Sequence, residues 1–281
     1  MRRILLSNDD GIHAPGLQAL AESLAGLGEI VIVAPDRDRS GTGHAITVRE
    51  DLHVERLELA GRWRAYAVSG TPADCVKLGV LELLESPPDL VVSGINAGAN
   101  LGIDVFYSGT VAAAFEGMLL GIPSLAISCV TSKESPDFQA ARAVAPLLAD
   151  WMVREMSGSP LLLNVNVPER VRATGPEALR WTRLGLRRRY RDGFAPGTGE
   201  PGWPQPDDRE TARRFRLVGD ADDGDSDDPT TDAGAVEAGW VSVTPIQLDV
   251  TDYGWLRRLG VAPGEPVTGL AKLRVDGRPA S

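Results

Sequence analysis

Apolar residues occur along the chain in short runs that alternate with stretches of helical spacing. The short runs have the length and composition of buried β-strands; they lie at 4–6, 30–33, 90–92, 125–127 and 161–165. The stretches between them place apolar residues three or four positions apart, which is typical of helices packed on a sheet; they cover 15–24, 72–84, 107–120 and 139–156. Strands separated by helices predict an α/β fold with a doubly wound, largely parallel sheet.

The pattern changes after Pro168, where Arg-rich, Gly/Pro-rich and acidic pieces replace the regular alternation. We expect an α/β core over 1–168 that carries the functional site, and an irregular, partly β extension over 169–281 that packs on it. Within the extension, 241–243 is interpreted as a short strand and 252–259 as a short helix.

Two charged runs in the extension have plain interpretations. The arginines at 187–189 predict a solvated or interface cluster. The Asp-rich stretch at 220–228 lacks the spacing of a Ca²⁺ loop, so a mobile acidic loop is predicted there.

Composition limits the class of protein. A chain of 281 residues with 43% hydrophobic residues can bury a substantial core, and its net charge of −10 opposes a stable complex with nucleic acid. No apolar run reaches the roughly 18 residues of a membrane span, and the N-terminus becomes acidic too early for a signal peptide. Cys75 and Cys129 form no CxxC pair, so we interpret them as buried thiols of a cytoplasmic protein.

The strongest candidate for chemistry is the string Ser7-Asn8-Asp9-Asp10-Gly11, which directly follows the first predicted strand. In an open parallel sheet, ligands bind at the carboxyl ends of the strands. Neighbouring residues of a strand point to opposite faces, so Asp9 and Asp10 share one site only if the chain turns there, as Gly11 permits. Two such carboxylates suit Mg²⁺ or Mn²⁺. The alternative is a polar loop in which an Asp caps the next helix.

Further loops offer donors at the same predicted edge, and each has a simpler interpretation. Ser40 brings a hydroxyl, with Arg37 and Arg39 beside it, or belongs to a polar turn with solvated arginines. Asn96 can give a carbonyl oxygen to a hard cation, or belongs to an ordinary Gly/Asn turn. Ser108-Gly109-Thr110 opens a helix, where N–H groups and hydroxyls can hold a phosphate; the alternative is simple N-capping.

Several common motifs are missing from the sequence. It contains no Gly-x-x-x-x-Gly-Lys-Ser/Thr P-loop and no Gly-x-Ser-x-Gly elbow. His13, His44 and His53 lack the spacing of zinc ligands. We interpret His53 as structural, whereas His44 follows the Ser40 loop and is a candidate to face the site. Thr71 and Pro72 predict a helix start, as N-cap and first helical residue.

Taken in order, these loops resemble the SurE family of survival-protein-E phosphatases, which act on nucleoside monophosphates. The resemblance covers most of the chain and is carried by Ser7-Asn8-Asp9-Asp10-Gly11, Ala34-Pro35-Asp36-Arg37 with Arg39-Ser40-Gly41, Gly70-Thr71-Pro72-Ala73-Asp74-Cys75-Val76, Ser93-Gly94-Ile95-Asn96-Ala97-Gly98-Ala99-Asn100-Leu101-Gly102, Tyr107-Ser108-Gly109-Thr110-Val111-Ala112-Ala113-Ala114 and Ser242-Val243-Thr244-Pro245. It implies a Rossmann-like core and a 5′-nucleotidase activity, and it leaves activity on 3′-nucleotides and polyphosphate open.

The same resemblance implies one divalent metal ion per subunit, Mn²⁺ or Mg²⁺, held by Asp9, Asp10, Ser40 and Asn96. Ser108-Gly109-Thr110 would bind the phosphate, and Asp9, Asp10 and Asn96 would be the catalytic residues. On this hypothesis a metal-activated water attacks in line, with either Asp as its base. A phospho-aspartyl intermediate ranks lower, because no Asp-x-Asp-x-Thr arrangement is present. A homodimer or homotetramer is implied, in which the C-terminal part reaches a neighbouring subunit.

The chain departs from the family pattern in two places. Thr42-Gly43-His44-Ala45-Ile46-Thr47 replaces an expected run of small residues with Ser and Asn, and 187–228 is longer and more acidic. Two other classes of protein stay open from the residues alone. A receiver-like signalling domain also carries an acidic pair after its first strand, and a non-catalytic nucleotide-binding module needs the same cradle. Release of inorganic phosphate separates both from an enzyme.

Overall fold

The computed structural model describes residues 2–131, 136–156, 158–186, 190–196, 215–221 and 225–264. The chain divides into two compact units, Met1–Ile246 and Gln247–Ser281. The first unit holds every candidate site residue.

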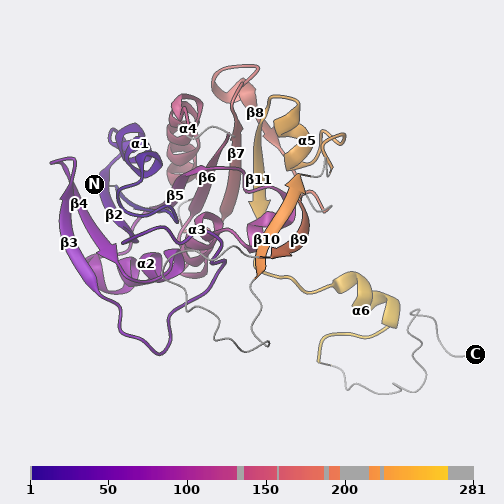
Figure 1. Cartoon of the computed structure of the whole chain (residues 1–281), viewed down its shortest axis with the longest axis horizontal. Helices are drawn as coiled ribbons and strands as arrows, with labels where there is room; N and C mark the ends of the chain where they lie inside the picture. Colours follow the sequence, from indigo (N-terminus) through magenta and orange to yellow (C-terminus); the bar gives the residue numbers. More distant parts are fainter. Residues whose placement is uncertain are drawn as a thin grey trace, which may run out of the picture. The chain divides into compact units, whose positions relative to one another are not determined.

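A nine-stranded sheet forms the centre of the first unit. Its strands are β1 (Arg3–Ser7), β2 (Glu29–Pro35), β3 (Val54–Leu59), β4 (Trp63–Val68), β5 (Leu90–Ala97), β6 (Ser124–Val130), β7 (Leu162–Pro168), β8 (Leu179–Trp181) and β11 (Val241–Ile246). Their order is β3-β4-β2-β1-β5-β6-β7-β11-β8 (Figure 1). Pairing is parallel from β4 to β7 and antiparallel where β3 joins β4 and β11 joins β7. The predicted α/β fold with a largely parallel sheet is confirmed.

Helices cover both faces of this sheet, with α1 (Pro15–Leu24) and α4 (Gln139–Glu155) on one face and α2 (Pro72–Leu78) and α3 (Gly109–Leu119) on the other (Figure 1). Successive side chains of a strand point to opposite faces. In β1, Ile4 and Leu6 therefore join the core under α1 and α4, whereas Leu5 joins the core under α2 and α3. This two-sided burial explains why the parallel strands are almost purely apolar.

The order of the strands reverses at β1, which pairs with β2 on one side and with β5 on the other. Where two neighbouring strands send their following connections in opposite directions, a crevice opens at the carboxyl ends of these strands. Asp9 and Asp10 follow β1, and Asn96 lies at the end of β5. The topology therefore places these candidate residues at the position where α/β sheets bind ligands.

Three elements differ from the sequence-based prediction. The hairpin of β3 and β4 was missed because β3 is an edge strand with mostly exposed, partly charged residues and no apolar run. The helix predicted over 72–84 ends at Leu78 and continues as a wider π-helical turn over Gly79–Leu83. Strand β5 runs on to Ala97 beyond the predicted 90–92, so Asn96 belongs to the strand end.

The start of α2 agrees with its prediction. The Thr71 hydroxyl accepts a hydrogen bond from the Asp74 N–H (3.1 Å), and Asp74 Oδ2 accepts one from the Thr71 N–H (2.9 Å). This reciprocal capping box satisfies two backbone donors that a helix start leaves unpaired.

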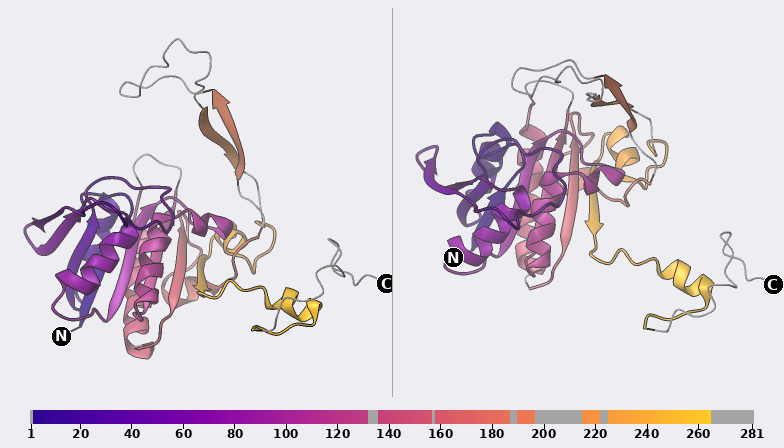
Figure 2. Two further views of the ribbon diagram at one scale, coloured as in Figure 1. Left: turned by 90° about the horizontal axis from the view of Figure 1, so that it is seen from below. Right: turned by 60° about the horizontal axis from the view of Figure 1, so that its bottom comes forward.

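The chain beyond Pro168 is irregular and partly β, as predicted. Strands β8 and β11 extend the main sheet, whereas β9 (Tyr190–Pro196) and β10 (Phe215–Ala221) form a separate antiparallel pair, drawn in brown and orange in Figure 2. A short helix, α5 (Asp232–Glu237), was not predicted. The division at residue 168 stays a prediction. The arginines at 187–189 and residues 222–224 of the acidic stretch lie outside the described residues.

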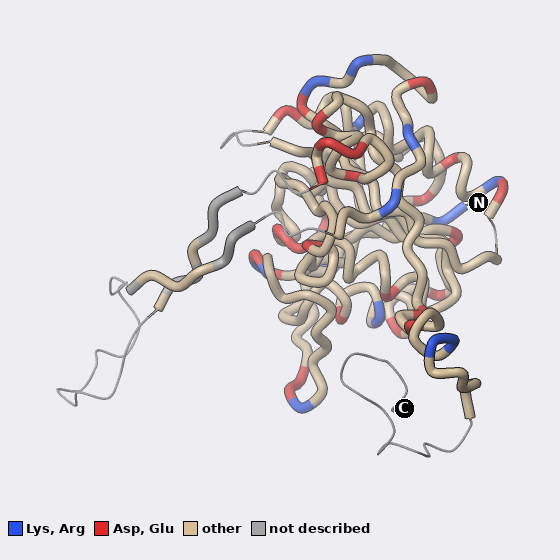
Figure 3. Tube along the Cα trace, turned by 90° about the vertical axis from the view of Figure 1, so that its right-hand side faces the viewer, with Lys and Arg blue, Asp and Glu red and all other residues tan. Residues whose placement is uncertain are grey.

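The second unit contains α6 (Tyr253–Leu259), which confirms the helix predicted at 252–259. Asp252 caps it by accepting from the Trp255 N–H (2.9 Å). Across the described parts of the chain, no helix has the length and hydropathy needed to span a membrane. Basic and acidic residues are interspersed along the described trace (Figure 3).

Both cysteines are buried thiols, as predicted, and Cys129 Sγ donates to the Asp137 carbonyl (3.5 Å). Burial is the main cause that raises the pKa of the Cys75 thiol well above its ordinary range, and the Asp74 charge adds to it. Cys75 is therefore a protonated core residue, and we assign it no part in the chemistry.

Candidate functional site

The loops after β1 and β2 are joined by backbone contacts at the carboxyl edge of the sheet. The Arg39 N–H donates to the Asp9 carbonyl (2.8 Å), and the Ile12 N–H donates to the Pro35 carbonyl (2.8 Å). Gly11 makes the expected turn with φ +99°, and a Cβ there would lie 3.1 Å from the Arg37 carbonyl carbon. Glycine is therefore required both by its backbone angle and by the approach of the second loop.

Asp9 lies directly against the N-terminus of α3. Its carboxylate is buried, and Oδ1 accepts a hydrogen bond from the Thr110 hydroxyl. A Cβ on Gly109 would lie 2.7 Å from Asp9 Cβ and 3.0 Å from Asp9 Oδ2, so only glycine leaves room for this carboxylate. Asp9 and the predicted phosphate cradle are thus in contact.

Asp10 faces the end of β5. The Ala97 N–H donates to its carboxylate, next to Asn96 in the chain. Burial, followed by the charges of Asp9 and Asp38, raises the Asp10 pKa to about 6. Burial likewise raises the pKa of Asp9, against the hydrogen bond from Thr110. Partly buried carboxylates that repel one another are stabilised by a cation placed between them.

Asn96 lies at the end of β5, and Ser40 lies in the loop after β2. The Asn96 amide nitrogen donates to the Gly98 carbonyl (3.0 Å), which leaves its amide oxygen as the atom to coordinate a cation. The Ser40 hydroxyl donates to Asp38 Oδ1 (2.6 Å). Asp38 was not singled out from the sequence, although its charge acts on both Asp9 and Asp10. The sequence signal for Asp38 was its place in the loop after β2, two residues before the candidate ligand Ser40.

These donors fit a hard divalent cation. Carboxylate, amide and hydroxyl oxygens are the ligands that Mg²⁺ and Mn²⁺ prefer. Within the described ranges, no group of three or more His, Cys, Asp and Glu residues could hold a metal ion. A zinc-like site is therefore unsupported in that part of the chain, and a cation here would need amide, hydroxyl or water oxygens besides Asp9 and Asp10.

The predicted phosphate cradle is the first turn of α3. Ser108 is its N-cap, and its hydroxyl accepts from the Val111 N–H (3.1 Å), so the capping interpretation holds for this side chain. The Thr110 hydroxyl is engaged by Asp9. Of the N–H groups of the first turn, that of Val111 is held by Ser108 and that of Thr110 faces the Asp9 carboxylate. The Gly109 N–H has no partner within the helix, and together with the positive end of the helix dipole it could bind an anion here.

A buried amide network, missed from the sequence, supports the chain between Asn96 and Ser108. The Asn100 N–H donates to Asn166 Oδ1 (2.8 Å), and the Asn100 side chain donates to Ser128 Oγ (2.8 Å). The side chains of Asn164 (2.8 Å) and Asn166 (3.0 Å) both donate to the Asn100 carbonyl. Polar residues inside the apolar run of β7 were the only sequence signal for this network.

His44 is turned toward α3. Its Nε2 lies 2.9 Å from Glu116 Oε2, and Lys77 Nζ lies 2.8 Å from Glu116 Oε1. The Glu116 side chain is only 3% exposed, so its charge depends on these two partners. The backbone of the same segment is held to the cradle, since the Gly43 N–H donates to the Tyr107 carbonyl (3.0 Å). This cluster ties the 42–47 segment to α2 and α3.

Replacing Glu116 with Gln is expected to lower the free energy of unfolding by about 2 kcal/mol at neutral pH, because two charge-assisted hydrogen bonds are weakened. The hydrogen bond from His44, and then the contacts with Lys77, hold the Glu116 pKa below its ordinary value of 4.5. Such a carboxylate stabilises the fold above its unfolded-state pKa, and this stabilisation is lost as the pH falls through the lower folded-state pKa.

Urea unfolding of the wild type and E116Q over a range of pH checks this expectation. The difference in stability should be full at neutral pH and should shrink below about pH 4.5. Glu82→Gln, a change of an exposed residue, is the matched control and should cost less than about 0.5 kcal/mol. A difference between wild type and E116Q that does not change with pH contradicts the assigned ion pairs.

Comparisons of this chain with known proteins point to a single family. The family model described as survival protein SurE matches residues 4–191. The 5′-nucleotidase SurE of Nitrosococcus oceani is 45% identical over 266 residues, which covers 92% of this chain and 98% of that protein. The 5′-nucleotidase SurE of Syntrophotalea carbinolica is 46% identical over 252 residues, covering 89% of this chain and 93% of that protein.

A solved structure gives the same result for the fold. The crystal structure of the SurE protein from Aquifex aeolicus matches with a TM-score of 0.71 and 37% identity, covering 91% of this chain and 97% of that one. With a family model over more than half of the chain and relatives of nearly full coverage, the chain belongs to the SurE family.

Proposed function

We propose that this protein is a metal-dependent 5′-nucleotidase, a phosphoric monoester hydrolase that converts nucleoside monophosphates to nucleoside and phosphate. The observation that carries the proposal is the contact between Asp9 and the first turn of α3, through the Thr110 hydroxyl and the space at Gly109. It joins a cation-binding carboxylate pair to an anion-binding helix end, which is the combination that phosphoryl transfer needs. The relatives named above are 5′-nucleotidases, which supports the same activity.

The residues of the site then have separate roles in the reaction. The N-terminus of α3, through the Gly109 N–H and the positive end of the helix dipole, binds the phosphoryl oxygens and stabilises the charge that develops on them. Thr110 fixes the orientation of the Asp9 carboxylate. Asp10, held by the Ala97 N–H, is placed to orient the attacking water and accept its proton.

A divalent cation, Mn²⁺ or Mg²⁺, would be held by Asp9, Asp10, Asn96 and Ser40, where it would supply positive charge and lower the pKa of a bound water. Asn96 is fixed for this role by its bond to Gly98, and Ser40 by its bond to Asp38. One such ion per subunit satisfies the donor set.

The proposal extends to substrate range and assembly. Hydrolysis of 3′-nucleotides and polyphosphate would use the same cradle, because it recognises the phosphoryl group rather than the base. A homodimer or homotetramer is proposed because β9 and β10 expose large apolar side chains, Phe194, Phe215 and Val218, on a two-stranded pair. Exposed apolar surface of this kind marks sites of protein association.

The test is phosphate release from 5′- and 3′-nucleoside monophosphates and from polyphosphate, with Mn²⁺, with Mg²⁺ and with EDTA. Turnover of 5′-nucleotides that disappears in EDTA and returns with metal is expected. Metal-bound protein that releases no phosphate from any substrate would refute the enzyme and favour a binding module. Transfer of a single phosphoryl group to the protein without turnover would instead favour a signalling domain.

A further inference from the structure

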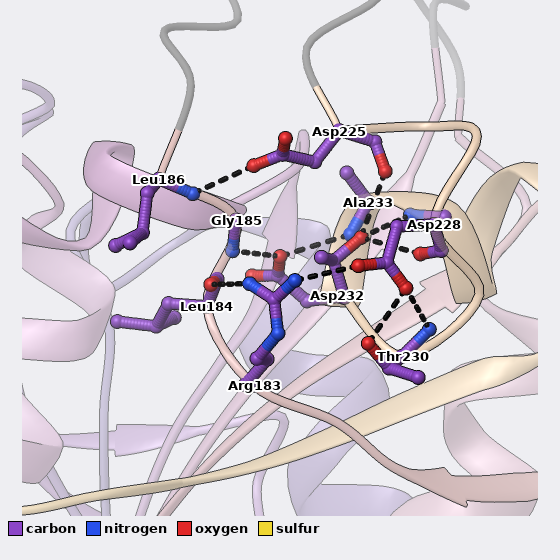
Figure 4. A network of polar contacts seen from close by, with 11 residues as sticks. Arg183, Leu184, Gly185, Leu186, Asp225, Asp228, Thr230, Asp232 and Ala233 are labelled. Carbon is purple, nitrogen blue, oxygen red and sulfur yellow. Dashed lines mark hydrogen bonds and ion pairs between the residues drawn. The ribbon is translucent and has the colours of Figure 1, made fainter.

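The carboxylate of Asp232 joins segments that lie far apart in the sequence. Asp232 is the first residue of α5 and is completely buried. Its Oδ2 accepts from the Gly102 N–H (2.7 Å), and its Oδ1 accepts from the N–H groups of Gly185 (2.9 Å) and Ala233 (2.9 Å). Figure 4 shows Asp232 between Gly185 and Ala233. All three partners are donors, so both carboxylate oxygens are required as acceptors.

A continuous hydrogen-bonded segment runs from Gly102 to the phosphate cradle. Gly102 opens a short 3₁₀ helix, Gly102–Phe106, in which the Asp104 N–H donates to the Leu101 carbonyl (3.0 Å). The Asp104 carbonyl in turn accepts from the N–H groups of Tyr107 (3.0 Å) and Ser108 (3.1 Å). The N-cap of α3 therefore follows the position of Gly102.

Gly102 itself has little freedom to move. Its φ is +55°, and a Cβ would lie 2.7 Å from the Gly185 carbonyl oxygen, so the two backbones are in contact. Asp232 holds the N–H groups of both. The amide network around Asn100 fixes the chain only two residues earlier, against β6 and β7.

We propose that Asp232 is a positioning residue for the phosphate cradle, acting through the Gly102 N–H on the segment that ends in the N-cap of α3. The proposal rests on the proposed function, since it concerns binding of the phosphoryl group. Asp232 does not touch the substrate; it sets where the first turn of α3 stands relative to Asp9. The same carboxylate connects the cradle to the segment that leads from Gly185 toward β9.

The effect is larger on phosphate than on metal. Asp9 contacts the first turn of α3 through Thr110, whereas Asp10, Ser40 and Asn96 are held by Ala97, Asp38 and Gly98. In D232N the amide keeps one acceptor oxygen, and its NH₂ group confronts one of the N–H donors. Because Oδ1 accepts two N–H groups and Oδ2 only that of Gly102, the NH₂ group is expected on the side of Gly102. The cradle then loses its support, while Asp10, Ser40 and Asn96 keep theirs.

The experiment compares full-length wild type, D232N and D228N. Asp228 belongs to the same network, where it accepts from Arg183 (2.6 Å) and from Thr230 (2.6 Å), so D228N makes the same charge change without touching Gly102 (Figure 4). Inorganic phosphate is the probe, measured by calorimetry and as a competitive inhibitor, and Mn²⁺ affinity and the melting temperature are measured alongside. D232N should bind phosphate about tenfold more weakly and show a higher KM, with a clearly smaller loss of Mn²⁺ affinity relative to the control.

Two results overturn the proposal: phosphate affinity in D232N equal to that of D228N, or a Mn²⁺ affinity that falls as much as the phosphate affinity, together with the melting temperature. If D232N does not fold, G102A tests the same contact between Asp232 and Gly102 by changing Gly102 instead. Normal phosphate affinity in G102A overturns the proposal as well. Phosphate binding is read without turnover. Wild type that binds phosphate but hydrolyses no nucleotide would refute the proposed function alone, whereas wild type that binds no phosphate would refute both.

Discussion

Replacing Asp10 with Asn is expected to reduce turnover of a 5′-nucleoside monophosphate by a factor of about 10³ or more, with the fold intact. The amide keeps the size of the side chain but removes the negative charge that would hold a divalent cation and the base that would accept a proton from water. Asp10 follows the carboxyl end of β1 and is only partly buried, so its replacement loses little packing. Steady-state kinetics with saturating Mn²⁺ and a titration of Mn²⁺ binding measure the two losses separately.

Asp150→Asn is the control for this prediction. Asp150 lies on α4 and pairs with Arg154 and Arg2, so its replacement makes the same chemical change away from the carboxyl edge of the sheet. Its activity should equal that of the wild type. Full activity of D10N with bound Mn²⁺ would remove Asp10 from the catalytic residues and leave Asp9 or Asp38 to be tested.

Replacing Gly109 with Ala is expected to lower kcat/KM by about 100-fold and to weaken Mn²⁺ binding. The new Cβ would lie 2.7 Å from Asp9 Cβ and 3.1 Å from Pro72 Cγ, closer than side-chain atoms pack. Either Asp9 or the first turn of α3 must move, and both belong to the proposed site. A displacement of a fraction of an ångström is enough to misalign a water and a phosphoryl group.

Gly26→Ala is the matched control, because a Cβ at Gly26 meets nothing within 4 Å and the backbone there needs no positive φ. Its kinetics and melting temperature should match the wild type. Wild-type activity of G109A would show that the contact between Asp9 and α3 is not needed for turnover. This contact would then no longer support the proposed function.

The sequence predicted the parts of the fold that depend on local pattern. Apolar runs flanked by helical spacing identified β1, β2, β5, β6 and β7, because parallel strands covered on both faces must be apolar throughout. Thr71 and Pro72 marked the start of α2 by their chemistry as cap and first helical residue. The candidate loops could also be placed, because the carboxyl ends of parallel strands share one edge.

What the sequence could not supply are contacts between residues distant along the chain. Asn100 and Asn166 are ordinary polar residues until the sheet brings β5, β6 and β7 together. Glu116 was hidden in a run of small apolar residues, and its partner His44 lies 72 positions away. Strand β3 lacks an apolar signal because only its pairing with β4 defines it.

The order in which the chain is synthesised adds a constraint to the amide network. All candidate metal and phosphate ligands are complete once the ribosome has made Thr110, yet Asn164 and Asn166 come more than 50 positions later and Asp232 later still. Long-range parallel pairing is slow to form, and a nascent chain exposes its unpaired strands in the meantime. The segment between Asn96 and Ser108 can therefore reach its final conformation only after β7 and α5 have left the exit tunnel. The candidate ligands are thus synthesised early, but the segment that supports them folds late.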